Sequence, residues 1–375
     1  MPEMSRETQN ELLALLSPHH SDISNRKALF DEAFAMTEQA RQLRGRVEFE
    51  GNARDYTTHL ISTLHDHGEI EAGRETIWVY CEAVIDRSGE EDTARFLALY
   101  DAINLGIPIT RDPETREPYK GLAYFTRDDA DYYFGRTGTI NRILTQLRQL
   151  PDDQRFLTVV GPSGSGKSSV VLAGVIPELL GDTNTNWIVL NRMAPGQTPI
   201  AALAATIASA TGGDPVTIQN NLSNGDATIL CTYVTQIVNL TERANTGVLL
   251  FVDQFEEVFT QTTDDDTRKH FIDLITNANC NGQLTAIITL RADFYGHPLA
   301  REQYSVLSDL IQAHQVNVKP MTARELLLAI EAPARKQGLW FESSLVRELL
   351  LAMQNEEGAL PLLQFTLRRL YGTLE

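Results

Sequence analysis

Cysteine is scarce in this chain. Only three occur among its 375 residues, Cys81, Cys231 and Cys280. Their odd number and wide spacing favour a reducing compartment and argue against a disulfide framework as the basis of the fold. No two of them have the spacing of zinc ligands, so we also expect no structural zinc site.

Long apolar runs are absent as well. The longest fall far short of the roughly 20 residues that cross a bilayer. Residues 1–6 lead into a polar helical pattern and lack the apolar core of a signal peptide. We therefore expect a soluble, cytoplasmic protein without a membrane partner.

Basic residues are outnumbered. The 32 Lys and Arg face 50 Asp and Glu, which gives a formal net charge of −18. Residues 1–110 hold 20 of the acids and 10 of the bases, so more than half of the excess charge lies in the first third of the chain. Proteins that hold nucleic acid by bulk electrostatics need the opposite balance, and we do not expect a nucleic-acid partner.

The first third of the sequence has the pattern of short amphipathic helices. Glycines follow three of them, at Gly68, Gly89 and Gly106, where helix ends are expected. Nothing there alternates as a strand would. We predict a compact all-α domain of five or six helices at 1–108, with helices at 7–16, 25–43, 55–65, 74–85 and 90–104.

The pattern changes after a linker. Residues 109–120 contain Pro113 and Pro118, directly after Pro108, and several charges. Beyond them, apolar runs alternate with helical stretches, which is typical of a parallel sheet with helices on both faces. We predict such an α/β core at 121–318, with strands at 156–160, 187–190, 248–252 and 284–290. Residues 319–375 are helical again and would form a lid and the start of a winged-helix region.

The run from Gly161 to Ser168 carries the most chemistry. It fits G-x-x-x-x-G-K-[ST], the P-loop, between a predicted strand and a predicted helix. Its backbone N–H groups would surround phosphates, Lys167 would reach the β- and γ-phosphates, and Ser168 would ligate Mg²⁺. We predict ATP or ADP with Mg²⁺ as ligands, bound by Gly161, Ser163, Gly164, Ser165, Gly166, Lys167, Ser168 and Ser169.

Three further positions fit this chemistry. Asp253 ends an apolar strand, where P-loop proteins place the acid that holds Mg²⁺ together with the P-loop hydroxyl. Glu256 or Glu257 would orient the attacking water, and spacing alone does not choose between them. Arg291 ends the next strand, at the sheet edge where ligands bind, and would contact the γ-phosphate.

These motifs resemble the novel STAND NTPases, which are signal-transduction ATPases. The resemblance covers roughly residues 115–372 and rests on several motifs in the same order: 118–122, 134–136, the P-loop, 252–257, 289–295 and 360–364. It implies a switch that binds ADP when closed, exchanges it for ATP and then oligomerises. It also implies that Arg136 lies near the adenine or ribose and that Pro361 contacts the base from the lid. Related switches carry Gly-x-Pro there, whereas Gly358 stands one position earlier.

The N-terminal helices resemble an effector-associated domain, a death-fold-like adaptor. The resemblance rests on residues 12–16, 26–29 and the helix pattern up to Gly106. It implies a partner effector, such as a protease, that bears a similar domain. Such proteins usually also have a sensor region, often a β-propeller, which would lie beyond Glu375 in a longer protein or on a separate one.

Together these features predict an ATP-dependent signalling switch, with slow ATPase activity that resets it, in prokaryotic defence or programmed-death signalling. Two alternatives stay open at this point. One is an AAA+-like ATPase that acts on nucleic acid. The other is a nucleotide-bound scaffold whose hydrolysis is slow or absent.

Overall fold

The computed structural model describes residues 4, 6–34, 40–71, 74–85, 87–99, 117–241, 243, 245–278, 280–337, 339, 341, 343–353 and 358–372. The chain forms two compact units. The first comprises Met1–Tyr119, Met321–Glu356 and Thr366–Glu375, and the second comprises Lys120–Pro320 and Glu357–Phe365. Residues 100–116, which hold most of the expected linker and the end of the helix expected at 90–104, lie outside the described residues.

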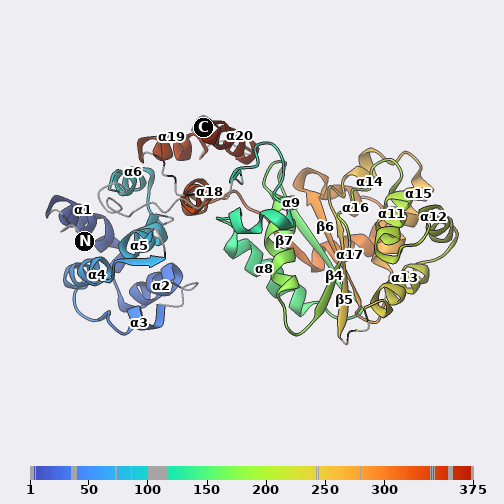
Figure 1. Cartoon of the computed structure of the whole chain (residues 1–375), viewed down its shortest axis with the longest axis horizontal. Coiled ribbons are helices and arrows are strands. Elements are labelled where there is room, and N and C mark those ends of the chain that lie inside the picture. The colour runs from blue at the N-terminus through green and yellow to red at the C-terminus, as the bar shows by residue number, and fades with distance from the viewer. Residues whose placement is uncertain are drawn as a thin grey trace. The chain divides into compact units, whose positions relative to one another are not determined.

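The N-terminal part of the first unit is a helical bundle, as expected (Figure 1). Its centre is α5 (Thr76–Ile85), in which every residue is buried. The expectation that this region has no strand is wrong, because β1 (Glu69–Glu71) and β2 (Arg74–Glu75) form a short antiparallel pair. Strands this short leave no alternating pattern to detect. The other elements of the bundle are α1 (Arg6–Leu16), η1 (Ser17–His20), α2 (Ile23–Phe34), α3 (Ala40–Arg44), α4 (Ala53–His67) and α6 (Glu90–Ala98).

The same unit includes helices from the C-terminal end of the chain. α18 (Ala323–Lys336) packs against α5, and α19 (Ser343–Met353) packs against α6. The Tyr119 hydroxyl donates to the carbonyl oxygen of Ile330 within α18. The helices expected to form the lid are therefore divided, because α20 (Leu360–Tyr371) begins in the second unit and ends in the first.

The second unit is built on a five-stranded parallel sheet with the order β4-β5-β6-β3-β7. Four of the strands are those expected from the sequence. The fifth, β7, has only three residues and was not predicted. Their bounds are β3 (Phe156–Gly161), β4 (Asn186–Val189), β5 (Thr246–Val252), β6 (Leu284–Arg291) and β7 (Gln315–Asn317).

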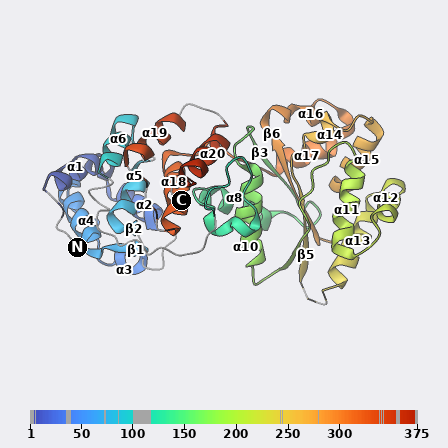
Figure 2. The same ribbon diagram turned by 45° about the horizontal axis from the view of Figure 1, so that its top comes forward.

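Helices cover both faces of this sheet, as predicted (Figure 2). Side chains of β5 alternate between the faces: Val248, Leu250 and Val252 join one buried cluster, whereas Leu249 and Phe251 join the other. The first cluster is covered by α11 (Pro199–Thr211), α12 (Pro215–Asn224), α13 (Thr228–Asn239), α15 (Asp265–Thr276) and α17 (Ser305–Ala313). The second is covered by α8 (Thr137–Gln149), the π-helical stretch η3 (Val170–Val175) and α10 (Ile176–Leu180). Short helical segments complete the chain: η2 (Arg127–Tyr132), α9 (Lys167–Ser169), α14 (Glu257–Thr260), η4 (Ala292–Phe294), α16 (Gly296–Leu299) and η5 (Glu302–Tyr304).

The cysteines correct one expectation. Cys231 in α13 and Cys280 before β6 form a disulfide, with their Cα atoms 4.9 Å apart. They are separated by 49 positions in sequence, but both belong to the same side of the sheet. Cys81 is free and buried in the bundle, where burial raises the pKa of its thiol. Among the described residues, no helix is long and apolar enough to cross a membrane.

Candidate functional site

The P-loop follows β3 at the carboxyl end of the sheet, the edge at which ligands bind in open α/β folds. Gly164 has a φ of +72°, a conformation that side chains disfavour, and Gly166 caps the N-terminus of α9. The helix expected at 168–180 is present as α9, η3 and α10. Its wider π-helical turn lies just ahead of Pro177, which has no amide hydrogen to donate.

Lys167 is almost fully buried within this loop. Its Nζ donates to the carbonyl oxygens of Gly161 at 3.0 Å and Pro162 at 2.8 Å. Burial lowers the pKa of the ammonium group, and the carboxylates of Glu256 and Asp253 act against that effect. Among the described residues, this desolvated cation has hydrogen bonds to backbone carbonyls alone, and an anionic phosphate would be a stronger partner.

Asp253 meets the P-loop although β6 lies between its strand, β5, and β3. Its Oδ1 accepts hydrogen bonds from Ser168 Oγ at 2.8 Å and from Thr289 Oγ1 at 2.6 Å. The carboxylate is completely buried. The predicted pair of Mg²⁺ ligands, Ser168 and Asp253, is therefore in direct contact.

This donor set fits Mg²⁺. The described residues contain no group of three or more His, Cys, Asp and Glu side chains that could hold a metal alone. Mg²⁺ prefers oxygen ligands and keeps several waters, so one carboxylate and one hydroxyl suffice when phosphate oxygens supply the rest. Bound Mg²⁺ would neutralise charge on the phosphates, and Lys167 would do so from the loop.

The two adjacent glutamates have different partners. Glu256 is buried, which raises the pKa of its carboxyl group, and its Oε2 accepts a hydrogen bond from the Arg291 backbone N–H at 3.2 Å. Glu257 Oε2 instead accepts from the backbone N–H of Gly196 at 3.0 Å. Glu256 is therefore the one whose charge interacts with Lys167.

Arg291 is at the expected sheet edge, but its side chain is occupied. Its Nε and Nη2 donate to the Asp293 carboxylate at 3.1 Å and 2.7 Å. Its guanidinium also lies over the ring of Phe294, 5.4 Å from the ring centre. Its side chain is 39% exposed, and its contact with the γ-phosphate stays a prediction.

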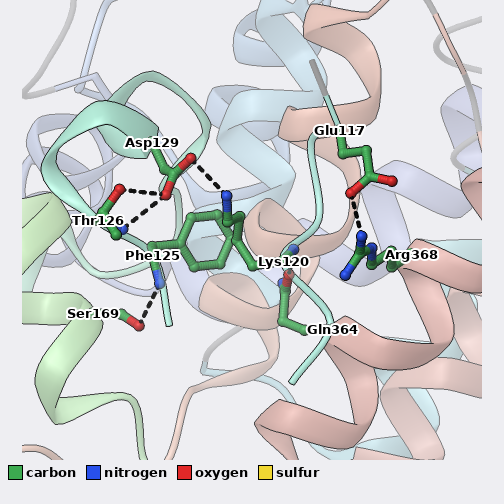
Figure 3. Close-up of polar contacts among 8 residues, drawn as sticks. All are labelled: Glu117, Lys120, Phe125, Thr126, Asp129, Ser169, Gln364 and Arg368. Carbon is green, nitrogen blue, oxygen red and sulfur yellow. Dashed lines mark hydrogen bonds and ion pairs between the residues drawn. The ribbon is translucent and has the colours of Figure 1, made fainter. Parts of the chain in front are cut away.

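Two other predicted residues form hydrogen bonds that connect the P-loop to neighbouring segments. Arg136 is 1% exposed, and it donates to the carbonyl oxygens of Ser165 and Lys319, both at 2.9 Å. Ser169 Oγ accepts the backbone N–H of Phe125 at 3.1 Å (Figure 3). The structure thus connects the P-loop to the segment before α8 and to the chain after β7, and a contact of either side chain with nucleotide stays a prediction.

The start of α20 reaches the P-loop. A Cβ built on Gly164 would lie 2.7 Å from the carbonyl oxygen of Gly358, so the two backbones are in direct contact. Leu360 lies beside Gly166, which places the first turn of α20, with Pro361, next to the loop. Gln364 Oε1 accepts the backbone N–H of Lys120 at 3.3 Å, and Lys120 Nζ forms an ion pair with Asp129 at 2.9 Å (Figure 3).

The sequence analysis missed Arg192. It follows β4 at the same edge, and its Nε donates to Asp253 Oδ2 at 2.7 Å. The Asp253 backbone N–H donates to the Met193 carbonyl oxygen at 2.8 Å, which fixes Arg192 beside the acid. An arginine just after a predicted strand was the available signal, and it is the same signal that identified Arg291.

A family model named Novel STAND NTPase 1 matches residues 118–375, which is more than half of the chain. The chain belongs to this family. A second model, effector-associated domain 8, matches residues 6–103 of this STAND NTPase. The chain thus combines an NTPase signalling module of P-loop fold with an N-terminal effector-associated domain.

Solved structures similar to this STAND NTPase include the Aeropyrum pernix ORC2 protein in ADPNP–ADP complexes, which is 15% identical with a TM-score of 0.45. That match covers 71% of this chain and 66% of the ORC2 chain, somewhat less than two thirds. A Walker-type ATPase of Pyrococcus abyssi is 14% identical with a TM-score of 0.43. That match covers 67% of this chain and 71% of the ATPase chain. A chain of the E. coli MS115-1 HORMA:CdnC:Trip13 complex is 11% identical with a TM-score of 0.37. That match covers 58% of this chain and 73% of the chain in the complex. No curated protein matches the chain.

Proposed function

We propose that this STAND NTPase is an ATP-dependent signalling switch. It binds ADP or ATP with Mg²⁺ at the P-loop, self-associates when ATP is bound, and returns to the resting state by slow hydrolysis. Its N-terminal domain then engages an effector with a similar helical domain, such as a protease. The setting that fits this combination is prokaryotic defence or programmed-death signalling in the cytoplasm.

The contact between Ser168 and Asp253, beside the buried Lys167, carries this proposal. It places a hydroxyl, a carboxylate and a cation together at the carboxyl end of a parallel sheet. Those are the groups that a Mg²⁺–nucleotide complex needs. The effector-associated domain supports signalling as the purpose of nucleotide binding.

The start of α20 supports a switch more than a simple hydrolase. Gly358 contacts the P-loop backbone, whereas α18 and α19 pack with the N-terminal helices in the other unit. A change at the P-loop would therefore be felt first at the start of α20, which lies beside the loop. A ligand shifts such an equilibrium only by binding the two states with different affinity.

Nucleotide binding tests the proposal. Lys167→Ala should weaken binding of ADP and of a slowly hydrolysed ATP analogue by about 100-fold, because it removes charge-assisted hydrogen bonds to phosphate. Lys269→Ala removes an exposed lysine that pairs with Asp273, and it should leave the affinity unchanged. Titration calorimetry measures both. Equal affinities for Lys167→Ala and the wild type would refute the assignment of the P-loop.

A further inference from the structure

Arg192 shares a carboxylate with the expected metal site. Asp253 Oδ2 accepts its Nε at 2.7 Å, while Oδ1 accepts the hydroxyls of Ser168 and Thr289. Asp253 is completely buried, and its ion pair with Arg192 compensates its charge. Arg192 thus supplies positive charge to the same carboxylate that a divalent cation would use.

Mg²⁺ held by Ser168 and Asp253 would share the Asp253 carboxylate with the Arg192 guanidinium. A guanidinium within hydrogen-bonding distance of a metal ligand repels the metal, and the repulsion is strong where burial lowers the effective dielectric constant. Mg²⁺ also demands near-octahedral geometry from the ligands it takes. Binding of the metal at Ser168 and Asp253 therefore weakens the hold of the carboxylate on Arg192 and favours movement of the guanidinium away from Oδ2.

Besides its ion pair with Asp253, the Arg192 side chain makes few polar contacts with the described residues. Of its donors, only Nε has a hydrogen-bond acceptor within the part of the chain that the structure describes. Its guanidinium lies over the ring of Tyr124, 4.8 Å from the ring centre, and 26% of its side chain is exposed. A cation–π contact at an exposed ring is weak, so Tyr124 adds little to what holds the guanidinium in place.

A terminal phosphate bound at the P-loop would be an acceptor for the displaced guanidinium. Ser168 directly follows Lys167, the residue expected at the β- and γ-phosphates, and Ser168 contacts the same Asp253 as Arg192. The planar fork of an arginine matches the oxygens of a terminal phosphate. A diphosphate lacks that group and leaves the displaced charge without a partner.

We propose that Arg192 determines the preference for triphosphate over diphosphate: it neutralises Asp253 in the metal-free site and moves to the terminal phosphate when Mg²⁺ binds. This inference rests on the proposed nucleotide-binding function and adds to it a coupling between metal and γ-phosphate. It differs from the role expected of Arg291, because Arg291 pairs with Asp293 and does not contact a metal ligand.

The test compares two nucleotides within each variant. The ratio of Kd for ADP to Kd for a slowly hydrolysed ATP analogue is measured by calorimetry, once with Mg²⁺ and once with a chelator. Arg192→Gln should lower this ratio about tenfold with Mg²⁺, the effect of one charge-assisted contact to phosphate, and leave it unchanged without Mg²⁺. Arg192→Lys keeps the charge but loses the planar fork of the guanidinium. Its ratio should lie between the ratios of the wild type and Arg192→Gln.

The comparison separates this role from a general structural effect. A variant that merely loosens the site weakens the binding of both nucleotides by the same factor, so the ratio of their Kd values stays unchanged. Arg148→Gln replaces an exposed arginine on α8. It is the matched control and should leave the ratio as in the wild type.

An unchanged ratio in Arg192→Gln, with nucleotide binding intact, overturns the inference about Arg192 but not the proposed function. An equal fall with and without Mg²⁺ also overturns it, since Arg192 would then contact phosphate without leaving Asp253. If the wild type binds neither nucleotide, the proposed function itself fails.

Discussion

Glu256 and Glu257 are neighbours in sequence with different surroundings, and this gives a prediction about hydrolysis. Glu256→Gln removes a buried carboxylate near Lys167, so it should slow nucleotide hydrolysis by about 100-fold or more while binding is kept. Glu257→Gln should change the rate by only a few fold, because a glutamine oxygen still accepts the Gly196 N–H. Single-turnover phosphate release from preloaded protein measures both. The reverse order of the two variants would show that Glu257 acts at the water.

His20 is a fully buried histidine of the N-terminal bundle. Thr57 Oγ1 donates to the Ala53 carbonyl oxygen, so it accepts the proton of His20 Nδ1 at 2.7 Å. The Tyr80 hydroxyl then donates to Nε2 at 2.9 Å. These contacts satisfy a neutral imidazole, and burial, with His19 and Arg26 nearby, lowers the pKa of His20 to about 3.

The low pKa of His20 predicts acid sensitivity of the bundle. The unfolded chain takes up this proton near pH 6.5 and the folded chain does so only near 3, so stability is complete above pH 6.5 and falls as the pH drops towards 3. The loss of unfolding free energy between pH 7 and pH 5 should be about 2 kcal/mol.

Urea denaturation measures this loss. It is followed by the fluorescence of Trp78 after replacement of the other two tryptophans. His20→Gln should remove most of this pH dependence, whereas His59→Gln, exposed on α4, should not. An unaltered slope in His20→Gln would contradict the assignment.

At this scale the sequence predicts a residue well where a contiguous motif fixes its place. Ser168 and Asp253 were expected to meet, and they do. Sequence spacing does not distinguish Glu256 from Glu257, because their partners, Arg291 and Gly196, are remote in the chain. Arg192 was missed for the same reason: its role depends on a backbone hydrogen bond that joins two separate strand ends.

Among the elements, the sequence predicted four of the five strands of the sheet, three of which are long buried runs, and it missed the shortest. β3, β5 and β6 each carry at least six residues and have mostly buried side chains. β7, with three residues, is a strand only because β3 offers it a partner. The apolar pattern also failed to indicate η3, because one π-helical turn within a longer helix is too short to change the periodicity of the stretch.

The contact between the start of α20 and the P-loop predicts a role for Gly358. Its φ is +80°, and a Cβ there would lie 2.9 Å from the carbonyl oxygen of Ser163. Gly358→Ala should therefore separate α20 from the loop. We expect faster hydrogen exchange of the Leu363 amide, which donates to Ala359, and release of bound nucleotide faster by about tenfold, equivalent to loss of one or two hydrogen bonds.

A second glycine provides the control for this element. Gly212, at the end of α11, has a similar φ of +70°, but a Cβ there would meet nothing within 4 Å. Gly212→Ala thus introduces the same backbone strain without a clash. It should lower the melting temperature and leave both α20 exchange and nucleotide release unaltered. If the two alanine variants release nucleotide equally fast, the contact at Gly358 does not hold the site closed.

At the scale of the whole molecule, the sequence pattern predicts the class of each domain but not which helices pack together. Helical periodicity at 322–370 correctly indicates helices, yet it does not show that α18 and α19 pack with α5 and α6. The disulfide between Cys231 and Cys280 was missed for a related reason, because a contact across 49 positions follows from the fold and not from spacing. Packing partners between distant segments are what the structure adds.

The net charge predicts how assembly should respond to salt. Each copy carries −18, so copies repel one another over a range that shrinks from about 30 Å at 0.01 M salt to about 10 Å at 0.1 M. Light scattering should find single chains with ADP and larger assemblies with a slowly hydrolysed ATP analogue, more so at the higher salt. Lys167→Ala should stay single in both. Nucleic-acid binding would weaken with salt instead. An equal mass with both nucleotides at every salt concentration would count against assembly driven by ATP.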